Sequence, residues 1–284
     1  HPDIGYVRIN VFSGKTVSDL RNVLQTLLDN GMEKLILDLR NDPGGLLDAA
    51  IAISDLFIDE GVIVSVRRRG QRESFEASPG DTLPDFPMVV LVNQNSASAS
   101  EILAACLKDH KRAAIAGQRT YGKGTVQQVL DLEGGLGALK LTTADYWRPN
   151  GRNINRGPDS TDEADWGVRP SPKLKVVLDD EEYEKLLVWR LRRDIPEGNH
   201  TVAVEGEPPD ADFVDRQLAR AIEYLTGNFD VDHPETDGSE ERAFGAGASE
   251  EGASEAGESE ANGLDERGAD LAPVQLSIDL RVQH

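Results

Sequence analysis

Three serines alternate with alanines in the segment SASASE (96–101), which Gln94 and Asn95 separate from the apolar run PMVVLVN (87–93). A strand must turn into a helix there, and a serine at such a turn lies beside free helix N–H groups that can stabilise an oxyanion. Ser98 is the candidate nucleophile, because its alanine neighbours would let a substrate backbone approach. A purely structural interpretation is also available, since Ser98 and Glu101 fit the S-x-x-E capping box of a helix N-terminus.

A serine needs a base before it can attack at neutral pH, and none of the five histidines is a convincing one. His110 ends the same expected helix, and the other four lie at the ends of the chain or in its tail regions. A lysine that is desolvated enough to be neutral can serve instead. Lys123 is the candidate, because it lies between two glycines just before an apolar strand, and we expect burial to lower its pKa. Gln127 on that strand could reach back to orient the amine.

The segment GQRTYGKGT (117–125) also nearly matches a phosphate-binding loop, which would make the chain a nucleotide-binding protein. Such a loop requires Ser or Thr directly after its lysine, because that hydroxyl holds Mg²⁺. Gly124 occupies this place and Thr125 comes one residue late, and the following TVQQVLDL is typical of a strand rather than of the required helix. Nucleotide binding therefore stays a weaker alternative.

The 284 residues carry a formal net charge of −21, much of it near the C-terminus. Residues 230–270 hold 14 acidic and 2 basic side chains, a net charge of −12, which leaves −9 for the rest. The lack of a basic stripe disfavours nucleic-acid binding, and no apolar run of 18 residues predicts a membrane span. Cys106 is the single cysteine and excludes an intrachain disulfide, and no His/Cys cluster has the spacing of a metal site. His1 as the first residue indicates a processed chain or a fragment.

The alternation of helix and strand patterns predicts an α/β fold with a largely parallel sheet. Strands are expected over 5–12, 34–40, 62–68, 72–77, 87–93, 113–117, 125–132 and 137–147. Helices are expected from Thr16, as a cap, to 28, and over 46–57, 98–110, 179–193 and 211–225, the last with Val214, Leu218, Ile222 and Leu225 on one face. Residues 1–175 should form the core, 176–228 a helical extension, 229–270 an acidic low-complexity linker, and 271–284 a short terminal segment with a weak strand pattern.

Five ordered segments resemble the carboxyl-terminal processing (tail-specific) peptidase family. They are LDLRNDPGG (37–45), SASASE (96–101), YGKGTVQ (121–127), GALKLTTADYWRPNGRNI (137–154) and WGVRPSP (166–172). The resemblance covers roughly residues 4–175, and the helix expected at 211–225 is similar to the C-terminal helix of that family. Each motif alone would be weak, but the order and spacing of all five are specific.

This resemblance implies a fold of the caseinolytic-protease and crotonase group and a Ser–Lys mechanism without metal or cofactor. Ser98 matches the nucleophile, Lys123 the general base, and Gln127 the residue that orients the lysine. Gly44 and the backbone N–H of Ala99 match the oxyanion hole. The glycines after LDLR then have a reason, because a backbone N–H must approach the substrate carbonyl without a Cβ in the way.

The sequence departs from the family at Asn41-Asp42, where Gly or Asn followed by Asn is usual. The aspartate adds a negative charge near the expected oxyanion hole. Family members also usually carry a PDZ domain ahead of the core, which recruits or gates the substrate tail, whereas this chain begins at the first strand of the core.

The resemblance predicts a serine endopeptidase that acts outside the cytoplasm and cleaves polypeptides with accessible tails near their C-termini. A catalytically silent peptide-binding member of the same fold and a nucleotide-binding protein remain alternatives. An enoyl-thioester enzyme of the related fold is less favoured, because it leaves Ser98 and Lys123 without a role.

Overall fold

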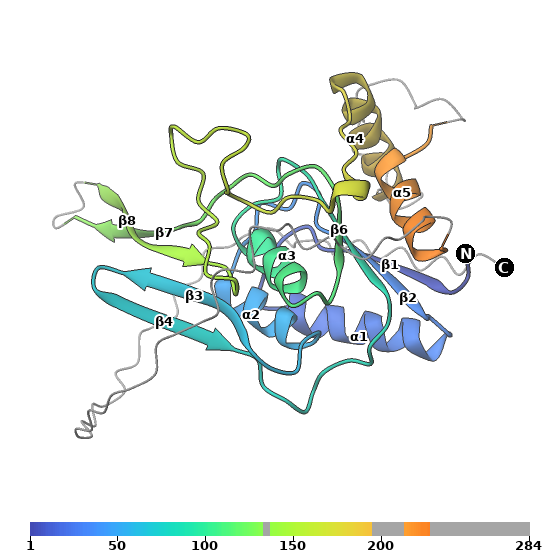
Figure 1. The fold of residues 1–284 in the computed structure, drawn as a ribbon, viewed down its shortest axis with the longest axis horizontal. Coiled ribbons are helices and arrows are strands. Elements are labelled where there is room, and N and C mark those ends of the chain that lie inside the picture. Colours follow the sequence, from blue (N-terminus) through green and yellow to red (C-terminus); the bar gives the residue numbers. More distant parts are fainter. Residues whose placement is uncertain (133–136, 195–212, 228–284) are drawn as a thin grey trace. The chain divides into compact units, whose positions relative to one another are not determined.

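The expected parallel sheet has four strands in the order β1-β2-β5-β6 (Figure 1). They are β1 (Ile4–Arg8), β2 (Lys34–Asp38), β5 (Met88–Val92) and β6 (Ala114–Gly117). The computed structural model describes residues 1–132, 137–194 and 213–227, all of which belong to one unit of the chain. The expected acidic linker and the terminal strand pattern lie outside these residues.

Both faces of this sheet are buried, which explains the continuous apolar runs of β2 and β5. Leu35, Leu37 and Val90 belong to one hydrophobic cluster, whereas Ile36 and Leu91 belong to another. Successive side chains of a strand point to opposite faces, so the sheet separates two cores.

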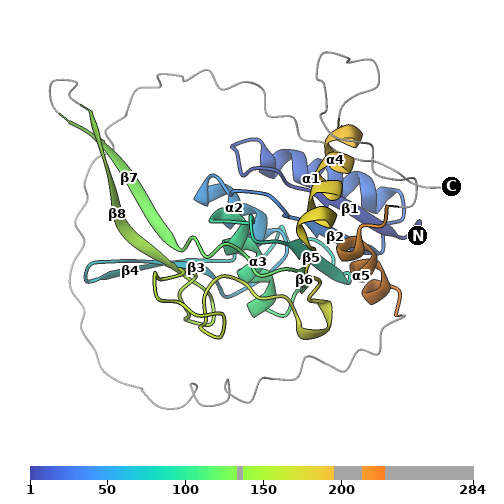
Figure 2. The ribbon, with the colours of Figure 1, turned by 90° about the horizontal axis from the view of Figure 1, so that it is seen from above.

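Helices cover both faces of the parallel sheet (Figure 2). They are α1 (Thr16–Asp29), α2 (Leu47–Asp55) and α3 (Ala99–Asp109) in the larger core, α5 (Arg216–Leu225) in the smaller core, and α4 (Asp180–Asp194) before α5. The loops that follow β2 and β5 lead into α2 and α3 from the carboxyl ends of adjacent parallel strands, the usual place for a binding site in such sheets. Among the residues described, no helix is both long and apolar enough to cross a bilayer.

A second four-stranded sheet is antiparallel, so the largely parallel arrangement expected from the sequence holds only for the first sheet. Its order is β4-β3-β8-β7, formed by β3 (Val62–Arg68), β4 (Gln71–Glu76), β7 (Thr125–Asp131) and β8 (Ala138–Trp147). Only Arg69 and Gly70 separate β3 from β4, and parallel pairing would need a crossover of about a dozen residues or more. The α/β class itself is confirmed.

Two expected helix starts are wrong. Thr16 lies one residue inside α1 rather than at its N-cap, and its hydroxyl donates to the Val11 carbonyl oxygen at 3.0 Å. Helix α5 begins later than expected, at Arg216, because the Asp215 side chain caps it. Val214 therefore precedes the helix and is 62% exposed, instead of lying on the buried face.

Candidate active site

Ser98 occupies the turn between β5 and α3, with φ 56° and ψ −115°. A residue other than glycine rarely has a positive φ, and holding it there costs on the order of 1–3 kcal/mol. The preceding residues fix this turn, since Ser96 Oγ donates to the Leu39 carbonyl oxygen at 2.8 Å and the Ala97 N–H donates to that of Asp42 at 3.0 Å. The surrounding fold thus maintains a strained, half-buried serine at a strand-to-helix turn.

The two residues expected to form the oxyanion hole lie together beside this serine. A Cβ on Gly44, which has φ 98°, would lie 2.8 Å from the Ala99 nitrogen and 2.9 Å from Ser98 Cβ, so only glycine fits there. The Ala99 N–H begins α3 and has no acceptor among the residues that the structure describes. The Gly44 N–H, in contrast, donates to Asp42 Oδ1 at 2.8 Å.

Asp42 is completely buried next to these donors. Its second carboxyl oxygen, Oδ2, is also buried and lacks a hydrogen-bond partner within the described chain. Burial raises the pKa of Asp42 to about 7, although the bond from Gly44 acts in the opposite direction. The charge that the Asn41-Asp42 pair was expected to add near the oxyanion hole is therefore one that titrates near neutral pH.

Glu101, on the first turn of α3, joins the serine turn to the lysine loop. Its Oε2 accepts the N–H groups of Ser98 at 2.9 Å and Lys123 at 2.7 Å. Its Oε1 accepts the Thr120 hydroxyl and the Gly122 N–H, both at 2.6 Å. Burial raises the pKa of this carboxyl group, and the four donated bonds offset part of that effect. The capping-box pattern predicts the contact with Ser98, but nothing local in the sequence indicates the bonds to the lysine loop.

The side chains of Lys123 and Gln127 are both exposed, which contradicts the burial expected for Lys123. Within the described residues, Lys123 Nζ forms no hydrogen bond with Ser98 or Gln127. The structure therefore brings the backbones of the proposed nucleophile and base to one carboxylate, but it does not join their side chains.

The glycines on either side of Lys123 explain why its backbone is held in place. A Cβ on Gly122 would lie 2.7 Å from Arg156 Cβ, and one on Gly124 would lie 2.2 Å from the Asn155 nitrogen. The loop is thus packed tightly against the segment that follows β8. It leads into the strand β7 and not into a helix, so the segment lacks the helix N-terminus on which a phosphate-binding loop depends.

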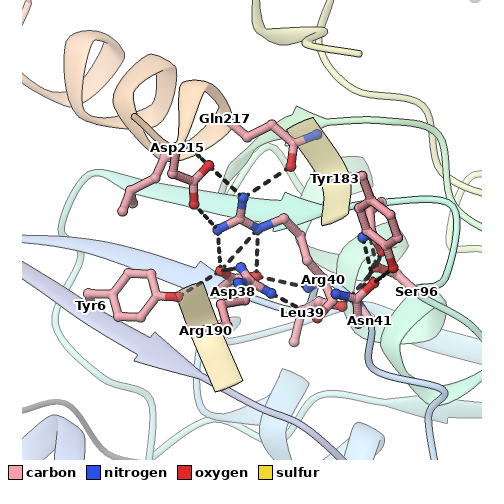
Figure 3. Close-up of polar contacts among 12 residues, drawn as sticks. Tyr6, Asp38, Leu39, Arg40, Asn41, Ser96, Tyr183, Arg190, Asp215 and Gln217 are labelled. Atoms are coloured by element: carbon pink, nitrogen blue, oxygen red, sulfur yellow. Dashed lines mark hydrogen bonds and ion pairs between the residues drawn. The ribbon is translucent and has the colours of Figure 1, made fainter. Parts of the chain in front are cut away.

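A buried ion-pair network lies just beyond the end of β2 (Figure 3). The Arg40 guanidinium donates to both carboxyl oxygens of Asp38, to Asp215 at 2.9 and 2.8 Å, and to Gln217 Oε1 at 3.0 Å. Arg190 of α4 also pairs with Asp38. Burial alone would raise the pKa of Asp38, but Arg190 and Arg40 hold it well below its usual range. The network ties α4 and α5 to the sheet and was not anticipated from the sequence.

Asn41 connects helix α4 to the loop that follows β2 and carries Gly44 (Figure 3). Its φ is 63°, and its Oδ1 accepts the Tyr183 hydroxyl at 2.7 Å and Asn93 Nδ2 at 2.8 Å. The Asn93 side chain returns a bond by accepting the Asn41 N–H at 2.9 Å. The loop that carries Gly44 is therefore held from β5 on one side and from α4 on the other.

A strained serine at a strand-to-helix turn, beside a free helix N–H, is typical of serine hydrolases built on α/β folds. The model of peptidase family S41 matches residues 3–163, and the chain belongs to this family. The resemblance to the carboxyl-terminal processing peptidases is thereby confirmed.

Relatives and a solved structure agree with this assignment. The carboxy-terminal-processing protease of Bartonella bacilliformis is 46% identical over 158 residues, which cover 54% of this chain and 36% of the relative. The carboxyl-terminal-processing protease of Synechocystis is 44% identical over 154 residues, with coverages of 54% and 36%. The photosystem II D1 C-terminal processing protease is 37% identical with a TM-score of 0.54, covering 62% of this chain and 42% of that one. The chain thus spans about a third of the length of these curated relatives.

Proposed function

We propose that this chain contains the catalytic core of a serine endopeptidase that cleaves polypeptides near their C-termini by a Ser–Lys acyl-enzyme mechanism. The observation that carries the proposal is the Glu101 carboxylate, which bonds the N–H groups of both Ser98 and Lys123. Because one buried side chain anchors both backbones, the two candidate reactive residues keep a defined relation to each other. Membership of the S41 family supports peptide hydrolysis as the reaction.

In this mechanism the neutral Lys123 amine takes the proton from Ser98 Oγ while that oxygen bonds to the substrate carbonyl carbon. The carbonyl electrons move to the oxygen, and the resulting oxyanion is stabilised by the N–H groups of Ala99 and Gly44. The carbon–nitrogen bond then breaks, and the leaving amine takes the proton from Lys123. Water hydrolyses the remaining ester, with Lys123 again acting as the base.

The exposure of Lys123 places a requirement on the substrate. A lysine in water is protonated at neutral pH, and desolvation favours its neutral form. We expect the bound polypeptide to cover Lys123 and exclude water from it, with Gln127 orienting the amine from β7. The partners are therefore polypeptides with accessible C-terminal tails, and the resemblance to processing proteases favours an extracytoplasmic location.

A fluorophosphonate probe and an unfolded polypeptide substrate test the proposal together. The wild-type chain should be labelled at Ser98 and should produce fragments that mass spectrometry maps near the substrate C-terminus. Ser98→Ala should abolish both signals while leaving the fold intact.

One observation favours a second candidate, a catalytically silent peptide-binding protein. Lys123 is exposed and unbonded to Ser98 in the described structure, as would suit a member without a working dyad. Peptide binding without labelling or cleavage would support this candidate and refute the peptidase.

A further inference from the structure

The Gly44 N–H has two competing uses. Asp42 Oδ1 accepts it at 2.8 Å and closes a turn over Pro43. The Ser–Lys mechanism requires the same N–H to face the substrate oxyanion. Gly44 is in direct contact with the turn that carries Ser98, since a Cβ on Gly44 would lie 2.9 Å from Ser98 Cβ. The side chain that holds this N–H can therefore influence the reaction.

We propose that Asp42 is a positioning residue for the oxyanion hole, which as a carboxylate retains the Gly44 N–H and as a neutral acid releases it to the substrate. This inference rests on the proposed Ser–Lys mechanism. Hydrogen bonds to ionised acceptors are roughly twice as strong as those to neutral ones, so the carboxylate form of Asp42 holds the Gly44 N–H more tightly than the neutral acid does and leaves it less available to the substrate carbonyl oxygen. A buried negative charge also opposes the charge that develops on the substrate carbonyl oxygen.

The immediate surroundings of Asp42 favour its neutral form. The side chain is completely buried, and its Oδ2 is without a hydrogen-bond partner in the part of the chain described. A buried carboxylate oxygen that receives no hydrogen bond is unfavourable. The groups of residues 97–100 that bond to Asp42 are uncharged: the Ala97 N–H and the Ser100 hydroxyl donate to its backbone carbonyl oxygen at 3.0 Å each.

The ionisable groups on the adjoining elements are engaged elsewhere. Arg40, on the segment before the turn, is bonded to Asp38 and Asp215. Glu101, on α3, accepts four bonds from the serine turn and the lysine loop. Neither is bonded to Asp42, so burial dominates and raises the pKa of Asp42 to about 7. The change between the two forms of Asp42 therefore falls in the neutral pH range.

The isosteric variant Asp42→Asn tests this proposal in the complete chain. Its amide oxygen can still accept the Gly44 N–H but carries no charge at any pH. The value of kcat/KM for an internally quenched peptide is measured from pH 5 to 10, and the ratio of variant to wild type is taken at each pH. Both proteins contain Lys123, so its titration cancels in the ratio.

We expect the ratio to rise with pH, from its lowest value near pH 5 to about 10-fold higher above pH 9. Removal of an oxyanion donor lowers the rate roughly 100- to 1,000-fold, and a smaller change is expected here because the Gly44 N–H is weakened as a donor rather than removed. The matched control is Asp48→Asn, an exposed position on α2, for which the ratio should stay flat. A flat ratio for Asp42→Asn would overturn the inference.

A second readout does not depend on activity. An unfolded aspartate ionises near pH 3.8 and folded Asp42 near 7, so the folded state keeps its proton longer and wild-type stability falls between these values. The melting temperature of Asp42→Asn minus that of wild type should therefore increase from pH 4 to 7 and then level off. A pH-independent difference also overturns the inference. Failure of the Ser–Lys mechanism is seen separately, because Ser98→Ala and Lys123→Arg would then still cleave peptide.

Discussion

Replacing Asp215 by alanine tests whether the buried network around Arg40 holds α5 on the parallel sheet. Asp215 accepts two hydrogen bonds from Arg40, at 2.9 and 2.8 Å, and caps α5 by accepting the Leu218 N–H at 3.1 Å. The two charged side chains are 0% and 5% exposed. The substitution therefore removes one partner of a buried ion pair and, in the same step, the cap of a helix.

The expected loss of stability follows from these two contributions. Removing one partner of a buried pair costs about 3–5 kcal/mol, and losing an N-cap costs about 1 kcal/mol. Arg40 keeps its bonds to Asp38, so the lower end of the first range applies and the total is about 4 kcal/mol. At about 2–4 °C per kcal/mol for a domain of roughly this size, the melting temperature should fall by about 8–16 °C. Asp215→Asn keeps an oxygen for the cap but loses the charge, so it should lose about 3 of these 4 kcal/mol.

Calorimetry and tryptophan fluorescence measure this loss. Trp189 reports on the helices directly, because its ring lies 6.2 Å from that of Phe213, next to α5. The matched control is Arg216→Ala, one residue away, since Arg216 is 55% exposed and, among the described residues, pairs with Glu182 at the surface. Such pairs contribute about 0–1 kcal/mol, so the control should melt within about 4 °C of wild type. An Asp215→Ala protein that melts like this control refutes the role assigned to the network.

Three further predictions concern the dyad, its anchor and the tail. Lys123→Arg should be as inactive in peptide cleavage as Ser98→Ala, because a guanidinium group cannot deprotonate. Cleavage near the wild-type rate would refute the assignment of Lys123 as the base. Gln127→Ala should lose less activity than either variant. Glu101→Gln should lower kcat/KM at least about 10-fold and should lower the melting temperature. Each carboxyl oxygen of Glu101 accepts two bonds, so the NH₂ group of glutamine would face two donors that it cannot accept. An unchanged rate would contradict the role of Glu101 as the anchor of the two backbones. Deleting residues 230–270 should leave the peptidase rate nearly unchanged and should lower the melting temperature by no more than about 5 °C. A larger fall in melting temperature would show that the tail docks.

Much of the parallel layer could be predicted from the sequence, because its signals are local. The continuous apolar runs of β2 and β5 reflect burial on both faces, and the apolar face of α1 ends at Asn30-Gly31 as expected. The antiparallel sheet could not be predicted in the same way. Strand patterns in β3 and β8 identify strands but not their partners, and the pairing of Ser65 with Trp147 joins segments far apart in the chain.

The candidate site also contains features that the sequence predicts and features that it does not. Ser98 could be proposed as a candidate because a serine between alanines at a strand end is a local pattern, whereas Gly44 was proposed only through the resemblance to the peptidase family; the structure gives this glycine a close backbone approach. The exposure of Lys123 was not predicted, since a lysine between glycines before an apolar strand does not reveal what covers it. The burial of Asp42 was not predicted either, because it depends on the packing of the α3 segment over the turn.

In the proposed mechanism the Glu101 carboxylate arranges the candidate nucleophile and the candidate base without contact between their side chains. It fixes the backbones of Ser98 and Lys123, while the Lys123 side chain stays in solvent. In the proposed mechanism the fold therefore supplies position, and the substrate supplies the desolvation that makes the amine neutral. Under this proposal only polypeptides that cover the lysine would be attacked, which would protect other proteins from cleavage. Asp42 adds a second condition at the oxyanion hole, because the Gly44 N–H must also be released before the reaction can proceed.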